Sequence, residues 1–242
     1  MVSGNRLFKD SGMAFLQSGD LRLQVDCGPF GFGGAGHSHS DSLSLIASLR
    51  GEPIFVDPGT YTYSSDPEER NWFRGSVAHN TVRIDGLNQG DIAGPFRWAS
   101  KPEVMIKAWN AEREGGSIEA VCRYKEFSHR RRILLESRRL LVFDEVDGPP
   151  GEHVCEQIWQ LGPAASKVGL AFSAPATSAH SKFSPVYGVK IPGTSLSAHI
   201  KGSFPLQIAM LLEPGRGNVI TVDEARRMLG ESTSAALSAP VG

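Results

Sequence analysis

The sequence predicts an all-β fold: a large antiparallel β-sandwich of stacked sheets with one short helix near the C-terminus. Three observations predict it. Apolar residues recur mainly at every second position, which is the period of a half-buried strand. Clusters of Gly, Pro, Asp and Asn interrupt these segments at intervals typical of antiparallel sandwiches. Only the segment 222–229 has a persuasive helical pattern.

The first clear strand, 21–27, alternates Leu21, Leu23 and Val25 with polar residues. Further strands are predicted at 42–49, 52–59, 80–86, 103–109, 117–124, 131–136, 139–146, 153–161 and 206–213, with turn clusters at 147–152 and 213–218. Asp223 can serve the first turn of the helix at 222–229. We expect one sandwich domain over residues 1–230. The small, polar segment 231–242 is predicted to be a flexible tail.

Charge and composition exclude several classes of protein. The 242 residues carry 25 Lys and Arg against 26 Asp and Glu, so no global positive field gathers nucleic acid. An acidic polymer would have to be held by local arginines. No apolar run reaches about 18 residues, which excludes a transmembrane helix. Cys27, Cys122 and Cys155 form no CxxC pair and are predicted to be buried thiols rather than a disulfide framework.

Three segments hold most of the residues that carry chemistry. In GFGGAGHSHSDS (31–42), glycines give a pliable backbone, and His37 and His39 project to the same face of an extended chain. Asp57 ends the strand in VDPGTYTY, and His79 opens the strand in FRGSVAHNTVRI. Two imidazoles and one carboxylate can hold a zinc ion and leave a fourth position for water. The pattern alone does not determine whether Asp57 and His79 converge on the histidine pair.

These segments resemble the heparinase II/III-like polysaccharide lyases. The resemblance rests on GHSHSDSLSLIASLRGEPIFVDPGTYTY (36–63) and RNWFRGSVAHNTVRIDGLNQ (70–89). The segments HRRRILLESRRLLVFDEVDGPPGEHVCEQIWQLGP (129–163) and DSGMAFLQSGDLRLQVDCGP (10–29) are also similar to that family. The resemblance covers roughly residues 10–165, and its H-x-H, VDPGTY and AHNTV motifs are specific in combination.

The resemblance implies a C-terminal antiparallel sandwich that packs against an N-terminal α/α toroid, with substrate in the cleft between them. It implies a zinc ion, usually regarded as structural, on His39, Asp57 and His79. His37 then faces the cleft and takes part in catalysis. The family's tyrosine acid/base and its carboxylate-neutralising Asn or His lie on the toroid. Nothing before residue 10 could build a toroid, so we expect the active protein to need one upstream.

The reaction implied by the resemblance is β-elimination from a uronic acid, in which a proton leaves C5 and the C4–O bond breaks. His37 suits the role of base, or of a cationic partner to the substrate carboxylate. Arg74 follows Trp72 in a predicted loop and can hold a uronate or sulfate while the aromatic ring stacks on sugar. Tyr61, Tyr63 and Asn80, which lie in the same motifs, complete the predicted substrate-binding residues.

Two other interpretations remain open. A cupin-type metalloenzyme also carries an H-x-H pair, but Asp41 is too close to that pair and Glu52 too far from it for the cupin pattern. A non-catalytic carbohydrate-binding or structural β-domain is the leading alternative if the chain works without a toroid. The basic run 129–132 is predicted to be an exposed charged edge. The resemblance suggests a periplasmic or secreted protein, although the N-terminus has no secretory signal pattern.

Overall fold

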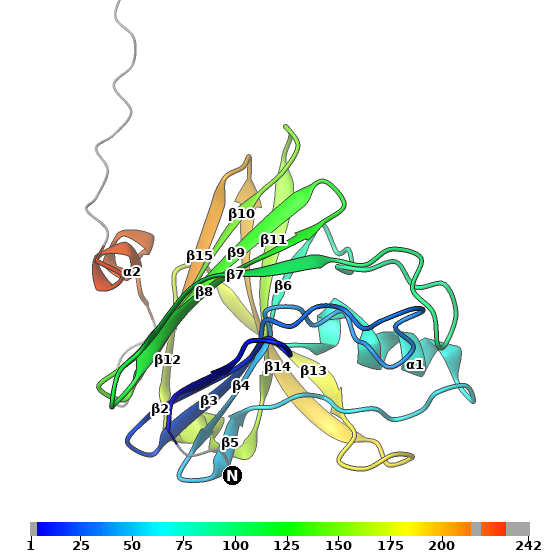
Figure 1. The fold of residues 1–242 in the computed structure, drawn as a ribbon, viewed down its shortest axis with the longest axis horizontal. Helices are drawn as coiled ribbons and strands as arrows, with labels where there is room; N and C mark the ends of the chain where they lie inside the picture. Colours follow the sequence, from blue (N-terminus) through cyan, green and yellow to red (C-terminus); the bar gives the residue numbers. More distant parts are fainter. Residues whose placement is uncertain (1–3, 214–218, 231–242) are drawn as a thin grey trace, which may run out of the picture.

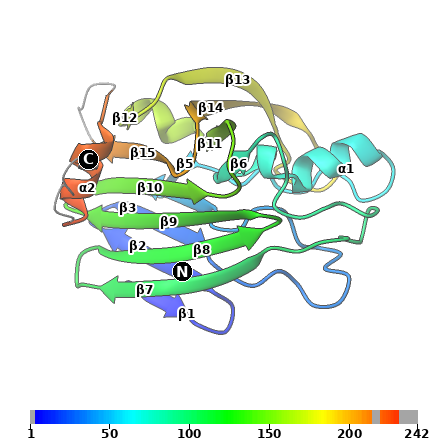
Figure 2. The same cartoon turned by 90° about the horizontal axis from the view of Figure 1, so that it is seen from above.

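The computed structural model describes residues 4–213 and 219–230, and they form two antiparallel β-sheets that pack face to face (Figures 1 and 2). The predicted all-β sandwich is therefore confirmed. The predicted tail, 231–242, lies outside the described residues. Among the described helices, none has the length and apolar character needed to cross a membrane.

One sheet has nine strands and provides the frame for the candidate site. Its order is β1 (Arg6–Phe8), β2 (Met13–Ser18), β3 (Leu21–Asp26), β4 (Leu45–Leu49), β5 (Glu52–Phe55), β11 (His153–Leu161), β14 (Ile191–Gly202) and β13 (Ala176–Phe183); the short strand β6 (Val82–Ile84) also pairs with β11. Strands β5 and β6 both pair with β11, so the segment that follows β5 and the segment that precedes β6 lie at one place on the sheet.

The second sheet has six strands in the order β12 (Gly169–Phe172), β15 (Leu206–Glu213), β10 (Arg139–Asp147), β9 (Phe127–Glu136), β8 (Gly116–Tyr124) and β7 (Glu103–Ala111). Figure 2 shows strands β7 to β10 side by side in front of the N-terminal strands. Burial alternates along β9, so one set of its side chains enters the space between the sheets.

The main core lies between the two sheets and contains the fully buried Trp159, whose ring packs 4.6 Å from that of Phe55. A second, smaller core lies on the other face of the six-stranded sheet. There α2 (Val222–Met228) places Ala225 with Leu141, Phe143 and Leu211. Cys27, Cys122 and Cys155 are buried free thiols, as predicted.

Helix α1 (Pro67–Arg74) and two long loops gather beyond the strand ends, on the right of Figure 1. These residues were predicted to form a loop, which was wrong, since they form helix α1. Its signal was present: Asp66 caps the helix by accepting hydrogen bonds from the Glu68 and Glu69 amides, and Pro67 stands at the first helical position. With only eight residues, the helix shows too little of an apolar stripe to be recognised by periodicity.

The prediction for the basic run 129–132 was also wrong. Strand β9 lies inside the six-stranded sheet between β8 and β10, so this run is not at an edge. His129 and Arg131 point into the core and are 0% and 2% exposed. A buried carboxylate, Asp144 on β10, compensates Arg131, which is why the charge is tolerated there.

Candidate active site and metal centre

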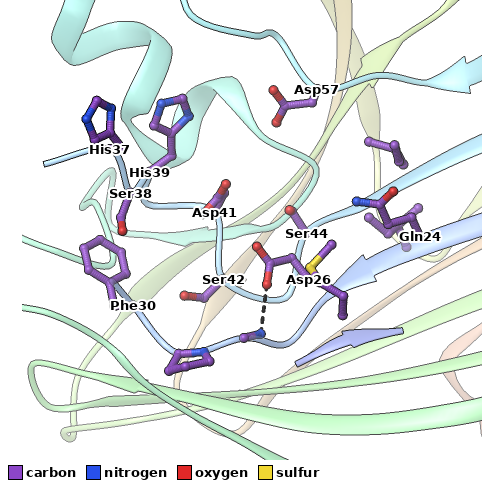
Figure 3. Close-up of a pocket in the computed structure, with 15 residues that line it drawn as sticks. Gln24, Asp26, Phe30, His37, Ser38, His39, Asp41, Ser42, Ser44 and Asp57 are labelled. Atoms are coloured by element: carbon purple, nitrogen blue, oxygen red, sulfur yellow. Dashed lines mark hydrogen bonds between the residues drawn. The ribbon is translucent and has the colours of Figure 1, made fainter. Parts of the chain in front are cut away.

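The motif HSHSDS (37–42) lines a pocket and is held in place by hydrogen bonds of its serines. His37, His39 and Asp41 line the same pocket, as the two-residue period predicts for the histidines (Figure 3). Between them, Ser40 is completely buried. The amide of Ser40 donates to the carbonyl of Arg74 at 2.8 Å, and its own carbonyl accepts from the Ser76 hydroxyl at 2.7 Å. These bonds attach the segment to the end of α1.

Ser42 anchors the end of the same segment. Its amide donates to Gln89 Oε1 at 2.8 Å, and its carbonyl accepts from Gln89 Nε2 and from the Thr81 hydroxyl. Thr81 follows His79 by two residues, so this bond also links the two histidine motifs. The serines therefore fix the backbone that presents His37, His39 and Asp41.

The pocket has a volume of about 370 Å³ and carries several acidic groups. Besides the histidines, Asp26, Asp41 and Asp57 line it, and they come from the end of β3, the HSHSDS segment and the segment after β5 (Figure 3). Burial raises the pKa of Asp41 to about 6. A pocket that holds this many carboxylates beside imidazoles is suited to a cation.

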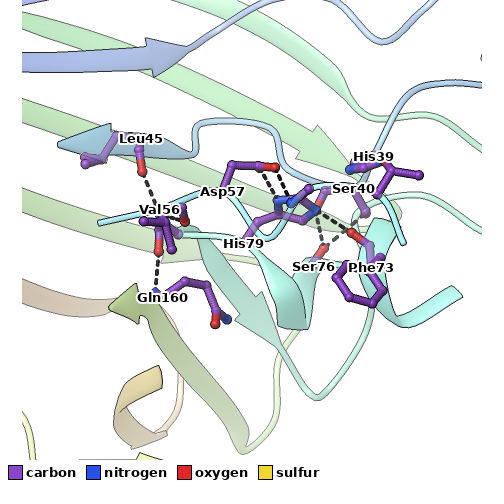
Figure 4. Close-up of polar contacts among 12 residues, drawn as sticks. His39, Ser40, Leu45, Val56, Asp57, Phe73, Ser76, His79 and Gln160 are labelled. Atoms are coloured by element: carbon purple, nitrogen blue, oxygen red, sulfur yellow. Dashed lines mark hydrogen bonds and ion pairs between the residues drawn. The ribbon is translucent and has the colours of Figure 1, made fainter. Parts of the chain in front are cut away.

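Three residues of the described chain can offer ligands to one ion: His39, Asp41 and His79. Their ligand atoms all lie within 4.8 Å of one another. Asp57 is adjacent, because its Oδ2 lies 3.0 Å from Nδ1 of His79 (Figure 4). The two predicted histidines thus converge, and Asp57 touches one of them. Asp41 was missed as a ligand candidate, although its place in the same alternation was a usable signal.

The hydrogen bonds of His79 favour metal binding through one nitrogen. Nε2 lies 3.1 Å from the carbonyl oxygen of Phe73, so we assign a hydrogen to Nε2 and the free position to Nδ1. This is the usual arrangement behind a metal-binding imidazole. Burial alone would lower the pKa of His79, but Asp57 outweighs burial and raises it. The raised pKa means that Nδ1 readily takes up a proton, which would face the Asp57 carboxylate. A cation between Nδ1 and that carboxylate would take the place of this proton.

His39 is held in the neutral form that a metal ligand requires. Burial, together with the neighbouring His79, lowers the pKa of His39 to about 3. Its Nε2 lies 3.4 Å from the Thr60 hydroxyl and 3.5 Å from the Arg70 guanidinium, and its ring centre is 5.2 Å from that of His79. The residues present therefore fit a metal ion.

Two arginines of α1 lie beneath this segment. Arg70 and Arg74 are one helical turn apart, and both are 0% exposed. Arg70 donates to the carbonyls of Gly36 and Pro95, and Arg74 donates to those of Gly94 and Pro95. Neither makes a salt bridge among the described residues. Both guanidinium groups thus place positive charge beneath the loops of Gly36, Gly94 and Pro95.

Arg74 was predicted to bind substrate, but its guanidinium is buried and bonded to the protein's own acceptors. Asn80 was also predicted to bind substrate and is also buried. It is 1% exposed, donates to the carbonyls of Leu45 and Val56, and accepts from the amide of Gln160. Both residues hold loops and strands around the site in this structure. A direct contact of either with substrate therefore forms no part of our proposal.

Two aromatic rings lie against His37, which is exposed. Tyr63 meets the imidazole edge-on at 5.6 Å, and Phe96 lies 6.1 Å from it. Tyr63 is also stacked between Phe96 and Tyr187, with ring centres 5.5 and 5.3 Å apart. Phe96 and Tyr187 are 47% and 62% exposed and were not predicted, because each comes from a loop distant in sequence. We call Phe96, Tyr63 and Tyr187 the aromatic column.

Tyr61 and Trp72 are half-buried and carry lysines over their rings. Lys190 lies 4.9 Å from the ring centre of Tyr61, and Lys182 lies 5.1 Å from that of Trp72. Both lysines also pair with Oε1 of Glu69 on α1. Both predicted aromatic residues thus lie next to cationic groups.

Comparison with protein families places this chain in a known group. The family model described as Heparinase II/III-like, C-terminal, matches residues 2–226. A heparin-sulfate lyase of Bacteroides stercoris is 26% identical over 135 residues, which are 52% of this chain and 18% of that lyase.

Solved structures share the fold. A heparinase III gene product superposes with a TM-score of 0.73 and 20% identity, over 87% of this chain and 36% of that protein. The heparan sulfate lyase HepC of Pedobacter heparinus gives 0.71 and 16%, over 89% of this chain and 37% of that protein. The chain thus spans little more than a third of these structures and less than a fifth of the curated relative.

Proposed function

We propose that this chain, which belongs to the heparinase II/III-like C-terminal family, is the sandwich part of a polysaccharide lyase. The lyase cleaves uronic-acid-containing polysaccharide by β-elimination. The observation that carries this proposal is the placement of His37. It is exposed at the mouth of a pocket, on a segment fixed by buried serines, and it contacts aromatic rings on one side. Buried arginines lie beneath the same segment.

The chemistry of β-elimination explains why these groups suit it. Removing the C5 proton places more negative charge on a sugar that already has a carboxylate, so positive groups must oppose that charge. In the proposal, His37 either takes the proton or, when protonated, pairs with the substrate carboxylate. Arg70 and Arg74 add a fixed positive potential without contacting the sugar. The exposed faces of the aromatic column and the Trp72–Lys182 pair contact sugar rings and acidic groups.

We further propose that the metal centre holds Zn²⁺ in a structural role. His39 and His79 are its imidazole ligands, and Asp57, Asp41 or both supply the carboxylate. The donor set of nitrogen and carboxylate oxygen suits zinc, and the Phe73 carbonyl orients His79 behind it. Bound zinc would neutralise the carboxylates of the pocket and keep the HSHSDS segment in place beside His37.

The active protein in this proposal includes an α/α toroid that supplies the rest of the site. The matched relatives are much longer than this chain, which leaves room in them for such a domain. A periplasmic or secreted location also belongs to the proposal and is supported by the resemblance to bacterial lyases. A role restricted to carbohydrate binding is the other candidate, and the exposed aromatic column supports it.

Activity measurements decide between these two functions. The chain, alone and with its upstream helical domain, is incubated with heparin, heparan sulfate and alginate, and the ultraviolet absorbance of the unsaturated product is followed. We expect product only with the helical domain, and expect His37→Ala to remove turnover while zinc content stays unchanged. Ser38→Ala, on the adjacent position, is the matched control and should retain most turnover. Binding of these polymers without product in any combination would support the carbohydrate-binding function instead.

A further inference from the structure

A completely buried ionic network crosses the core close to the site. Its centre is Asp144 on β10, which accepts from Arg131 at 2.7 and 2.8 Å, from His129 at 2.8 Å and from Gln157 at 2.7 Å. Arg131 and His129 belong to the six-stranded sheet, whereas Gln157 lies on β11 of the other sheet. All four side chains are between 0% and 2% exposed. The network therefore links the two sheets.

Arg131 also reaches beyond the ion pair. Its second terminal nitrogen donates to the carbonyl oxygens of Leu43 and Asn80, at 2.8 and 2.7 Å. Leu43 lies two residues after Asp41, and Asn80 follows His79 directly. One guanidinium therefore holds the two backbone segments that carry the candidate metal ligands, although they are 37 positions apart in the chain.

The backbone at Leu43 shows why such a contact is needed. Leu43 has a φ of +62°, a left-handed conformation that is rarely adopted by a residue of this size. This turn redirects the chain from the HSHSDS segment into β4. Its amide is held by the carbonyl of Asp26 at 2.8 Å, and its carbonyl is held by Arg131. The conformation that ends the ligand-bearing segment thus depends on partners from elsewhere in the fold.

We propose that Arg131 is a positioning residue that sets the distance between the HSHSDS segment and the His79 segment, and so determines how well His39, Asp41 and His79 bind one metal ion. Asp144 orients its guanidinium, and Gln157 and His129 complete the carboxylate's partners. The inference rests on the proposed metal centre for its functional meaning. The contact between Arg131 and the two carbonyls does not depend on that centre.

Arg131→Lys in the full-length protein tests this role. The lysine keeps a positive charge beside Asp144 but cannot reach the carboxylate and both carbonyls together. Arg132→Lys is the matched control, because Arg132 neighbours it on β9 and packs over Phe143 on the opposite face. The zinc dissociation constant, the absorption spectrum of the Co²⁺-substituted protein and the amide hydrogen exchange are measured for each.

For Arg131→Lys we expect about 10–100-fold weaker zinc binding, the usual effect of losing a residue that orients ligands, and a changed Co²⁺ spectrum. Arg132→Lys should match the wild type. A folded Arg131→Lys with wild-type zinc affinity and spectrum would overturn the inference, even if its melting temperature falls. If Arg131→Lys does not fold, Arg131→Met with Asp144→Leu removes both charges together and is measured in its place.

Hydrogen exchange separates failure of this inference from failure of the metal proposal. If the wild type binds no zinc, the metal centre is wrong. Faster exchange in Arg131→Lys confined to residues 41–45 and 79–82 would then still support the positioning role. Exchange that is unchanged there, or raised equally across both sheets, would contradict it.

Discussion

At the scale of single residues, the site depends on how the HSHSDS segment is held. His37, His39 and Asp41 line the pocket, while Ser40 is completely buried and, like Ser42, bonds to the neighbouring chain segments. The carboxylates of Asp26, Asp41 and Asp57 lie in one pocket, so at neutral pH their negative charges require a positive partner. An ordinary surface aspartate has no such requirement.

Zinc affinity should depend on Asp41 and on pH. Metal ligands must be deprotonated, and burial raises the pKa of Asp41 to about 6, so zinc binding should weaken as the pH falls through about 6. Asp41→Asn should weaken binding and remove this part of the pH dependence, which titration with a competing chelator measures. Asp57→Asn is the parallel variant. Wild-type affinity and pH dependence in Asp41→Asn would leave Asp57 as the carboxylate ligand.

At the scale of elements, α1 connects the site to the rest of the fold. Its two buried arginines hold the loops of Gly36 and of Gly94 and Pro95. On its outer side, Glu69 bonds to Lys182 and Lys190 of the β13–β14 hairpin. A helix of eight residues has little stability alone, so its cap and these contacts decide whether it forms.

Asp66→Ala removes the cap of α1 and should lower the free energy of unfolding by about 1 kcal/mol. Because α1 positions the loops beside His37, turnover of the complete enzyme should fall as well. The control is Thr221→Ala, which removes the cap of α2 on the far face of the other sheet. Chemical denaturation and the absorbance assay should give a similar loss of stability for both variants and a loss of turnover for Asp66→Ala alone. Equal turnover in both would mean that α1 does not influence the site.

At the scale of the whole molecule, the site lies where β5, β6 and β11 meet, and the core network of Arg131 reaches it from the opposite sheet. Metal binding and folding should therefore be linked, because an ion bound only by the folded state stabilises that state.

Removal of metal with a chelator should lower the melting temperature. Free zinc at about 100 times its dissociation constant would stabilise the fold by about 2.7 kcal/mol, and each kcal/mol corresponds to roughly 2–4 °C in a chain of this size. The raised pKa of Asp41 sets the sign of the pH effect. The metal-free fold must bury that charge above about pH 6 and loses stability as the pH rises. The chelator should thus lower the melting temperature more at pH 7.5 than at pH 5.5; an equal effect at both would contradict the role given to Asp41.

The sequence by itself determined the sheet-forming segments and the residues that carry the chemistry. Strands 153–161 and 206–213 were predicted with their observed bounds, because alternation and flanking turns are local properties. The pairing of His37 with His39 on one face was likewise local. The convergence of His39 with His79 was not, since 40 positions separate them and their segments meet through tertiary contacts, such as the bond of the Thr81 hydroxyl to the Ser42 carbonyl.

The tertiary structure also decided the role of every charged residue whose partner is distant in sequence. Arg74 and Arg131 look like surface cations in the sequence, yet one is enclosed by the carbonyls of Gly94 and Pro95 and the other by Asp144, Leu43 and Asn80. A charge can be buried only where hydrogen-bond or ion-pair partners meet it. Tertiary contacts between distant segments supply those partners, and the local sequence pattern does not show them. The sequence therefore determines which groups are available, while the fold decides which of them face the pocket and which hold the site together.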